Sequence, residues 1–371
     1  GASNTAVGKF AGLAVTTGVQ NTFIGAIAGD AITTGSYNAV LGQSALSSDT
    51  LGSSSVAIGH NALGTQNFTS ATHTYNTAVG VLAGLSVTTG VQNTIVGGLA
   101  GDAITVGGAN VAIGYGALGL EDTGNRNVAV GNLALAVQNS HASNYNTAVG
   151  YGAGTAVTTG VENTLLGGDT GTGLTVGIEN TFVGYKAGTH SVATVNGRFN
   201  TLIGSYSKTS AAHTDYAIGI GSDIVAAEGY TTLGKGVDDI RAAHGNITWA
   251  TVSDQRYKKD IVDSTAGLSF INALQPRTFK YKTLGELPEA FNAYKADSTE
   301  VFKNSDTNHG FIAQEVKAAI DADSSIKDGF RLWDDRDDGS QEVAEAALIP
   351  VLTKAVQELS TALDAALARI A

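Results

Sequence analysis

Asn76-Thr77-Ala78-Val79-Gly80 is one copy of a phrase that decides the fold, because close variants recur, mostly every 17 residues, up to Gly234. Earlier copies are N-T-A-V-G at Asn4–Gly8 and N-T-F-I-G at Asn21–Gly25. A longer phrase, G-L-A-V-T-T-G-V-Q-N-T at Gly12–Thr22, returns almost unchanged about 72 residues later. Repetition at a short fixed period is typical of solenoids, in which each coil packs only on its neighbours.

Each phrase shows the alternation of a β-strand. Thr77 and Val79 share one side and Ala78 takes the other, which predicts a strand of about five residues. A second strand is expected in each coil, for example at Ala14–Thr17 before the turn at Gly18. Two strands and two turns per coil describe a parallel β-roll or β-helix. The asparagine before each strand recurs in register, so its side chain should form a ladder along the coils or cap the turn.

The amino-acid composition argues against several classes of function. The formal net charge of −12 argues against nucleic-acid binding, which needs clustered lysine and arginine. The chain has no cysteine, so disulfides and thiolate metal sites are excluded. No apolar run is long enough to cross a membrane, and no membrane insertion is expected. Small residues dominate the repeats, so a single stack has a thin core and is expected to need partners.

The repeats resemble the head repeats of trimeric autotransporter adhesins and the repeats of phage tail-fibre shafts. The resemblance covers residues 1–234 and implies a trimeric parallel β-roll/β-helix that forms a shaft or tip. Polar inserts at Gln66–Tyr75 and Gln138–Tyr145 lengthen two of the gaps and are expected to be loops.

A different composition begins after the last repeat. Residues 235–252 are expected to link the repeats to a second domain at 253–371. That domain contains S-D-Q-R-Y-K-K-D-I at Ser253–Ile261, G-L-S-F-I-N-A-L-Q-P-R-T-F-K-Y-K at Gly267–Lys282 and N-H-G-F-I-A-Q-E-V at Asn308–Val316. The order and wording of these blocks resemble the endosialidase-type intramolecular chaperone, the self-cleaving C-terminal domain of phage tail fibres and tailspikes.

The local patterns of this domain indicate a small α+β fold. A helix is expected at Gly267–Leu274, ended by Pro276, followed by a strand at Thr278–Tyr281 and a strand or turn entering a helix over Gly310–Ile320. The last helix should carry Pro350 in its first turn. Its apolar residues follow alternating steps of three and four: Ile349, Leu352, Val356, Leu359, Leu363, Ala366 and Ile370.

This heptad seam predicts a coiled coil over about 341–371. The residue types do not fix the number of helices, and the family resemblance implies a trimer.

The resemblance to this chaperone family also implies a self-cleavage reaction. Members of the family cut themselves before the serine of S-D-x-R-x-K, so the scissile bond would be Val252–Ser253, with Ser253 as nucleophile and Lys258 as its base. A lysine can accept a proton only if its pKa is depressed by burial or by a nearby cation, and Arg256 and Lys259 would contribute to that. The activity would be that of a single-turnover serine endopeptidase of the Ser-Lys type.

Three further interpretations concern the neighbours of this pair. Asp254 and Arg256 are expected to orient the loop through an ion pair, and His309 is expected to support the site. The alternative for Ser253-Asp254 is an ordinary helix N-cap. Histidines are scattered, and the acidic run Trp333–Gly339 lacks the ligand spacing of an EF-hand, so no metal and no cofactor are expected.

Together the two resemblances imply a homotrimeric phage tail fibre or tailspike, located in the virion, that attaches to a host-surface glycan or outer-surface protein. Its C-terminal part would drive trimerisation and be released by cleavage. Two alternatives stay open at this point. One is a bacterial trimeric surface adhesin, and the other is a spike that binds or degrades polysaccharide.

Overall fold

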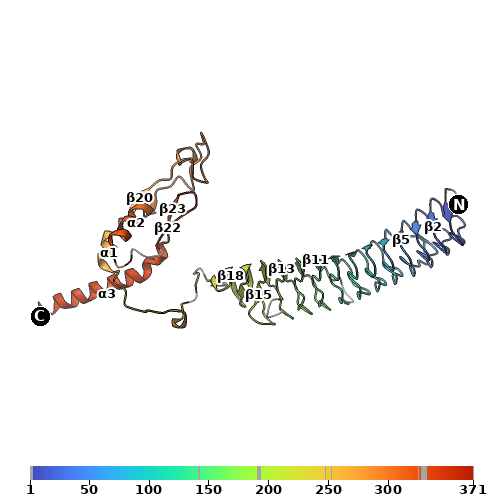
Figure 1. Ribbon diagram of the computed structural model, residues 1–371, viewed down its shortest axis with the longest axis horizontal. Helices are drawn as coiled ribbons and strands as arrows, with labels where there is room; N and C mark the ends of the chain where they lie inside the picture. Colours follow the sequence, from blue (N-terminus) through green and yellow to red (C-terminus); the bar gives the residue numbers. More distant parts are fainter. Residues whose placement is uncertain are drawn as a thin grey trace. The chain divides into compact units, whose positions relative to one another are not determined.

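The computed structural model of the protein describes residues 3–140, 143–189, 194–246, 248–251, 253–324, 326 and 332–370 (Figure 1). The chain divides into two compact units, Gly1–Ser253 and Asp254–Ala371, which are described separately below. None of the helices formed by the described residues is both long enough and apolar enough to cross a membrane.

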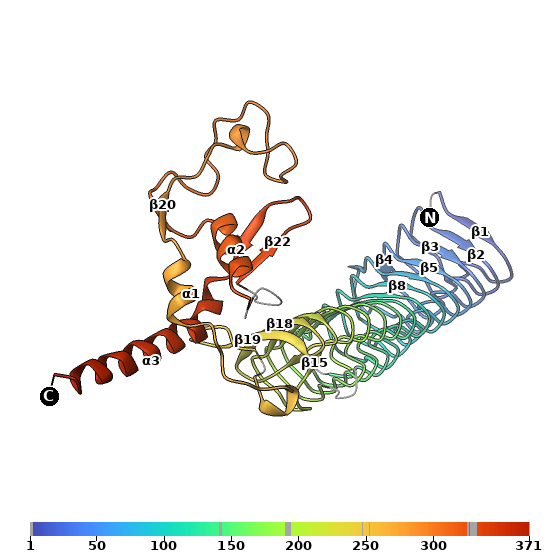
Figure 2. The same cartoon turned by 60° about the vertical axis from the view of Figure 1, so that its left-hand side comes forward.

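Unit 1 is a β-solenoid of about 13 coils built on one long sheet, whose strands stack side by side in Figure 2. Every neighbouring pair from β1 to β18 is parallel, and β19 runs antiparallel to β18. The strands of this sheet are β1 (Thr5–Val7), β2 (Thr22–Ile24), β3 (Ala39–Leu41), β5 (Val56–Ile58), β7 (Thr77–Val79), β8 (Thr94–Val96), β9 (Val111–Ile113), β10 (Val128–Val130), β11 (Thr147–Val149), β12 (Thr164–Leu166), β13 (Thr181–Val183), β14 (Thr201–Ile203), β16 (Ile218–Ser222), β18 (Tyr230–Lys235) and β19 (Asp238–Ala243).

Each repeated phrase forms one short strand. Ala78 is buried between Thr77 and Val79, as the alternation predicts. The strands up to β14 have two or three residues rather than about five, because the phrase ends at a glycine that turns the chain. At Gly80 (φ +141°), an added Cβ would lie 2.5 Å from the carbonyl oxygen of Gly97, so the close approach of successive coils requires glycine.

The second strand expected at Ala14–Thr17 does not form, and that expectation was wrong. Thr16 still donates its backbone N–H to Thr33 O in the next coil at 2.9 Å, so the coils are hydrogen-bonded there without regular strand geometry. Paired strands on this side occur only as two short pairs among the described residues. These are β4 (Gly52–Ser53) with β6 (Thr72–His73), and β15 (Lys208–Thr209) with β17 (Val225–Ala226).

A ladder of buried asparagines runs inside the solenoid. The Oδ1 atom of Asn93 accepts the backbone N–H of Asn110 at 3.0 Å, and its Nδ2 atom donates to Gly107 O at 2.9 Å. The same bonds recur from coil to coil, as between Asn21 and Asn4. The side chains therefore satisfy backbone groups at each turn while linking neighbouring coils.

The solenoid ends in an antiparallel hairpin. β19 lies within residues 235–252, the segment expected to be a linker, and Arg241 forms an antiparallel bridge with Ala250. Part of this segment therefore belongs to the folded end of unit 1.

Unit 2 is a small α+β domain. Its elements are η1 (Gln255–Tyr257), α1 (Leu268–Ala273), β20 (Arg277–Phe279), η2 (Leu284–Glu286), β21 (Asn308–Gly310), α2 (Ala313–Ala322), β22 (Trp333–Asp335), β23 (Gln341–Val343), η3 (Glu345–Ala347) and α3 (Leu348–Leu367). The strand pairs β20–β21 and β22–β23 are antiparallel. Phe270 of α1, Val316 and Ile320 of α2, and Val351 of α3 share one buried cluster.

The last helix begins later than expected. Residues 341–343 pair with β22 instead of joining the helix, so α3 starts at Leu348. Pro350 is consequently in its first turn, where the missing N–H costs no helical hydrogen bond.

Candidate functional site

Ser253 lies at the junction between the two compact units, because the division of the chain falls directly after it. Its side chain is exposed. The scissile bond expected from the sequence joins it to Val252, which lies outside the described residues. The serine is thus at the point where a cut would separate the two units from each other.

Asp254 and Arg256 form the expected ion pair. The guanidinium donates to the carboxylate from Nε, to Oδ1 at 3.0 Å and Oδ2 at 3.2 Å, and from Nη2 to Oδ2 at 2.6 Å. Asp254 also caps η1 by accepting the backbone N–H of Arg256 at 2.8 Å. These hydrogen bonds from Arg256 lower the pKa of the Asp254 carboxyl below its ordinary value. The N-cap therefore exists, but it is made by Asp254 and not by the serine.

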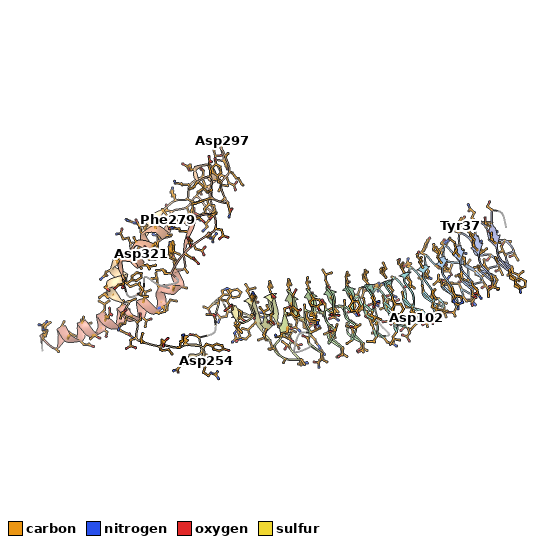
Figure 3. All side chains as sticks on the ribbon, viewed as in Figure 1. Tyr37, Asp102, Asp254, Phe279, Asp297 and Asp321 are labelled. Carbon is orange, nitrogen blue, oxygen red and sulfur yellow. The ribbon has the colours of Figure 1, made fainter. Side chains whose placement is uncertain are left out.

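The two lysines of the motif are exposed on the chain that follows η1. Lys258 is the C-cap of η1, with its backbone N–H bonded to Gln255 O, and Lys259 comes next. In Figure 3, Asp254 lies on this stretch, well away in the view from Phe279 and Asp321 in the folded part of unit 2. The burial required of a lysine base is therefore not supplied to Lys258 by unit 2 as a single chain.

His309 belongs to the β20–β21 strand pair, where it pairs with Thr278 and is exposed. Near it, Arg277 makes a bidentate ion pair with Glu315 of α2, at 2.9 and 2.7 Å. This pair lowers the pKa of Glu315 below its ordinary value. The ion pair thus links β20 to α2, and the supporting role of His309 stays a prediction.

Glu358 is a structural link that sequence reasoning missed. Its Oε2 atom accepts the backbone N–H of Leu268 at 2.8 Å, at the first turn of α1. The carboxylate thereby satisfies a backbone donor that no intrahelical partner could reach. Gly267 allows this approach, since an added Cβ would lie 2.6 Å from the carboxylate oxygens. No sequence signal connects residues 90 positions apart.

The seam of α3 faces away from the core of its own unit. Leu359 and Leu363 are 51% and 60% exposed, and Val356 is 63% exposed. The first two turns of α3 bury Val351 and Ala355. α3 therefore packs into the core of its unit near its start and carries an uncovered apolar stripe along the rest of its length.

Two carboxylates buried in the solenoid core were also missed. Asp49 accepts a hydrogen bond from Gln66 at 2.6 Å, and Glu121 accepts one from Gln138 at 2.9 Å. All four side chains are fully buried. The higher-order repeat could have revealed them, since both pairs recur at 72 residues. The same position in other coils is aliphatic, in Val15, Ile32, Val87, Ile104, Val157 and Leu174.

Each buried carboxylate anchors the insert that follows it. Asp49 also accepts the backbone N–H of Phe68 at 3.2 Å, and Glu121 accepts the side-chain amide of Asn144 at 2.9 Å. The loops expected at 66–75 and 138–145 are therefore held to the solenoid from inside. Within the described part of the chain, no three acidic or histidine side chains gather closely enough to hold a metal ion.

Comparison with known proteins identifies part of unit 2. Residues 253–323 match the family model described as the chaperone of endosialidase, over roughly a fifth of the chain. The match begins at the serine of the S-D-x-R-x-K motif. No curated protein and no solved structure gives a significant match. A β-solenoid followed by this chaperone domain fits a phage tail fibre or tailspike.

Proposed function

We propose that the chain is part of a homotrimeric phage tail fibre or tailspike that attaches the virion to its host. Unit 2 acts as an intramolecular chaperone that aligns three chains and then cuts itself off at Val252–Ser253. The observation that carries this proposal is the family match, which starts at Ser253, the residue at the junction of the two units.

Self-cleavage can be written as an acyl shift followed by hydrolysis. The Ser253 hydroxyl oxygen attacks the Val252 carbonyl carbon while Lys258 accepts the hydroxyl proton. The C–N bond breaks, the proton passes to the leaving amine, and an ester joins Val252 to the serine oxygen. Water then hydrolyses the ester, which leaves a carboxylate on Val252 and a free amino group on Ser253.

Assembly would switch this chemistry on. Ser253 and Lys258 are both exposed in the single chain. A neighbouring chain packed over the segment would desolvate the ammonium and favour the neutral amine. Cleavage would thus follow trimer formation rather than precede it.

The uncovered seam of α3 supports a chaperone that works by oligomerisation. Its exposed leucines can be buried only against other helices, and three copies of α3 supply these. The solenoid needs such help because its coils are nearly identical. A neighbouring chain slipped by one coil would meet almost the same surface, so the C-terminal helices must set the register.

The outward face of the long sheet supports self-association of the solenoid itself. Among the strands of this sheet from β1 to β14, the last residue is always Val, Ile or Leu, and none of these strands contains a charged residue. Val7 and Leu166 are 57% and 47% exposed. Parallel sheets are normally covered on both faces, and a second copy has the same length and period.

Replacing Ser253 with alanine tests the proposal. We expect wild-type protein to give fragments 1–252 and 253–371 by intact-mass analysis, and Ser253→Ala to stay full-length with the mass of a trimer by light scattering. Thr251→Ala is the matched control, because it removes an exposed hydroxyl two residues away and should still cleave. The same two fragments from the Ser253→Ala protein would refute the nucleophile.

A further inference from the structure

The chain returns to the outer edge of β19 just before the expected scissile bond. Arg241 donates its backbone N–H to Ala250 O at 2.8 Å, and Ala250 donates its N–H to Arg241 O at 2.7 Å. These reciprocal bonds are those of a hydrogen-bonded pair in an antiparallel ladder. Ala250 is two residues before Val252, whose carbonyl carbon is attacked in the proposed reaction. We call the pair of Arg241 and Ala250 the tail bridge.

A turn after β19 brings the chain back to that strand. Gly245 has a φ of +81°, in the left-handed region that glycine adopts without strain. Asn246 donates its N–H to Ala243 O at 3.0 Å. The Oδ1 atom of Asn246 accepts the N–H and the hydroxyl of Thr248 at 3.1 and 2.9 Å. Local hydrogen bonds therefore support the return of the chain between the two partners of the tail bridge.

The tail bridge adds little to the closure of the solenoid. β19 already pairs with β18 over six residues, from Asp238 to Ala243. Ala250 and its neighbours Trp249 and Thr251 are exposed, so the returning chain does not contribute to a core. Stability alone is therefore a weak explanation for this pairing.

The chain is also held on the amine side of the expected scissile bond. Asp254 accepts the backbone N–H of Arg256 at 2.8 Å and forms an ion pair with its guanidinium. In the sequence, only Thr251, Val252 and Ser253 lie between Ala250 and Asp254. The peptide bond that reacts therefore belongs to a short segment with a hydrogen-bonded residue at each end.

Pairing with a sheet edge is an established way of holding an extended peptide. The added strand is bound through its backbone hydrogen bonds, which do not depend on particular side chains. Holding reacting groups close to the geometry of attack lowers the barrier, and a misplacement of about 1 Å can cost about a hundredfold in rate. A fixed Ala250 restricts the positions open to a carbonyl group two residues further along the chain.

We propose that β19 positions the acyl side of the scissile bond for self-cleavage, by holding Ala250 through the tail bridge. Arg241 and Ala250 are positioning residues, and they act through their backbone groups. The inference rests on the proposed self-cleavage at Val252–Ser253. It gives the end of the solenoid a role in a reaction whose base follows it in the sequence.

Proline substitution tests the tail bridge, because Ala250→Pro removes the N–H that donates to Arg241 O. Cleavage is followed during cell-free synthesis, as the fraction of fragment 1–252 among chains with trimer mass. We expect Ala250→Pro to slow cleavage at least tenfold, and Ala250→Val, which keeps the N–H, to restore it.

Trp249→Pro is the matched control for the introduction of a proline ring. Backbone groups alternate along an antiparallel strand, so the N–H of Trp249 points away from β19. Its cleavage rate should stay within twofold of wild type. An equal loss of rate in Trp249→Pro and Ala250→Pro would overturn the inference, and so would an unchanged rate in Ala250→Pro.

A disulfide across the tail bridge separates positioning from obstruction. Arg241→Cys/Ala250→Cys places two thiols on a hydrogen-bonded pair, whose Cα atoms lie about 5.5 Å apart, within the range of a disulfide. The chain has no other cysteine, so only this bond can form within one chain. The oxidised variant should cleave at least as fast as the same variant kept reduced with dithiothreitol.

A trimer that cleaves only after reduction would show that the tail must leave β19, and would overturn the inference while self-cleavage stands. If Ala250→Pro does not reach trimer mass, the disulfide comparison decides by itself. Absence of cleavage in wild-type trimers would overturn the proposed self-cleavage and this inference together.

Discussion

Gln66 donates its side-chain amide to a carboxylate oxygen of Asp49 at 2.6 Å, in a core column where neighbouring coils carry Ile or Val. The pair replaces two stacked aliphatic side chains by two hydrogen-bonded polar ones. It therefore exchanges hydrophobic burial for specific anchoring of the insert at 66–75.

Replacing Gln66 alone should destabilise the protein more than replacing both Asp49 and Gln66. Gln66→Leu leaves the Asp49 carboxylate buried without its amide partner, and we expect a loss of about 3–5 kcal/mol. The double variant Asp49→Val/Gln66→Ile restores an aliphatic column and should be near neutral in urea unfolding followed by circular dichroism. Its insert, which loses the Phe68 bond, should be cut faster by protease. Equal destabilisation by the single and double variants would contradict this.

Replacing any one asparagine of the buried ladder should lower the stability of the solenoid. Asn93→Ala removes the acceptor of the Asn110 N–H and the donor to Gly107, and leaves both backbone groups buried. We expect a loss of about 1–3 kcal/mol in urea unfolding. The exposed Asn132→Ala is the control and should stay within about 0.5 kcal/mol of wild type. A similar loss in both variants would mean that the ladder contributes little.

Two acidic side chains should make the solenoid less stable at neutral pH. Burial raises the pKa of Asp30 and Asp102 above the ordinary 3.8, against an opposing backbone hydrogen bond. Asp30 Oδ1 accepts no hydrogen bond from any described residue. The stabilising contribution of a raised carboxyl is fully present below its unfolded pKa and is lost as the pH rises through the folded pKa.

Asp30→Asn and Asp102→Asn should therefore raise the melting temperature by about 1–3 °C each at pH 7. At pH 3, where both carboxyls are protonated in either state, the gain should disappear. Calorimetry across this range measures the difference, and an increase that persists at pH 3 would point to a cause other than charge.

Charges placed in the seam of α3 should abolish trimer formation. Leu359→Lys/Leu363→Lys puts six ammonium groups into a three-helix core, so light scattering should give the mass of a single chain. Gln357→Lys/Ser360→Lys adds the same charge at exposed positions outside the seam and should stay trimeric. A trimer that survives the seam variant would show that the solenoid face assembles by itself.

Much of the fold follows from local patterns in the sequence. Ala78 between Thr77 and Val79 predicts the buried centre of a strand, and the repeated asparagine predicts the ladder. The heptad positions predict an apolar stripe on α3, which is exposed as expected. These features depend on contacts with residues a few positions or one coil away. The periodicity of the sequence is therefore enough to predict them.

Other features depend on distant contacts that no period encodes. Glu358 meets Leu268 across 90 positions, and its role follows only from the packing of α3 on α1. The start of α3 was misplaced because Gln341–Val343 has a strand partner in β22. Ala14–Thr17 has the composition of a strand, but only single hydrogen bonds connect it to the next coil. The predicted catalytic residues Ser253 and Lys258 are exposed in the single chain, and one sequence does not describe how several chains pack together.

The antiparallel hairpin of β18 and β19 closes one end of the long sheet in unit 1. Without β19, the outer edge of β18 would be unpaired and could accept a parallel coil from another molecule. β19 runs antiparallel to β18, so a further coil cannot continue the parallel pairing. β19 also carries the charged residues Asp238, Asp239 and Arg241, which disfavour pairing with a strand of another molecule at this edge. The parallel part of this sheet therefore ends at β18.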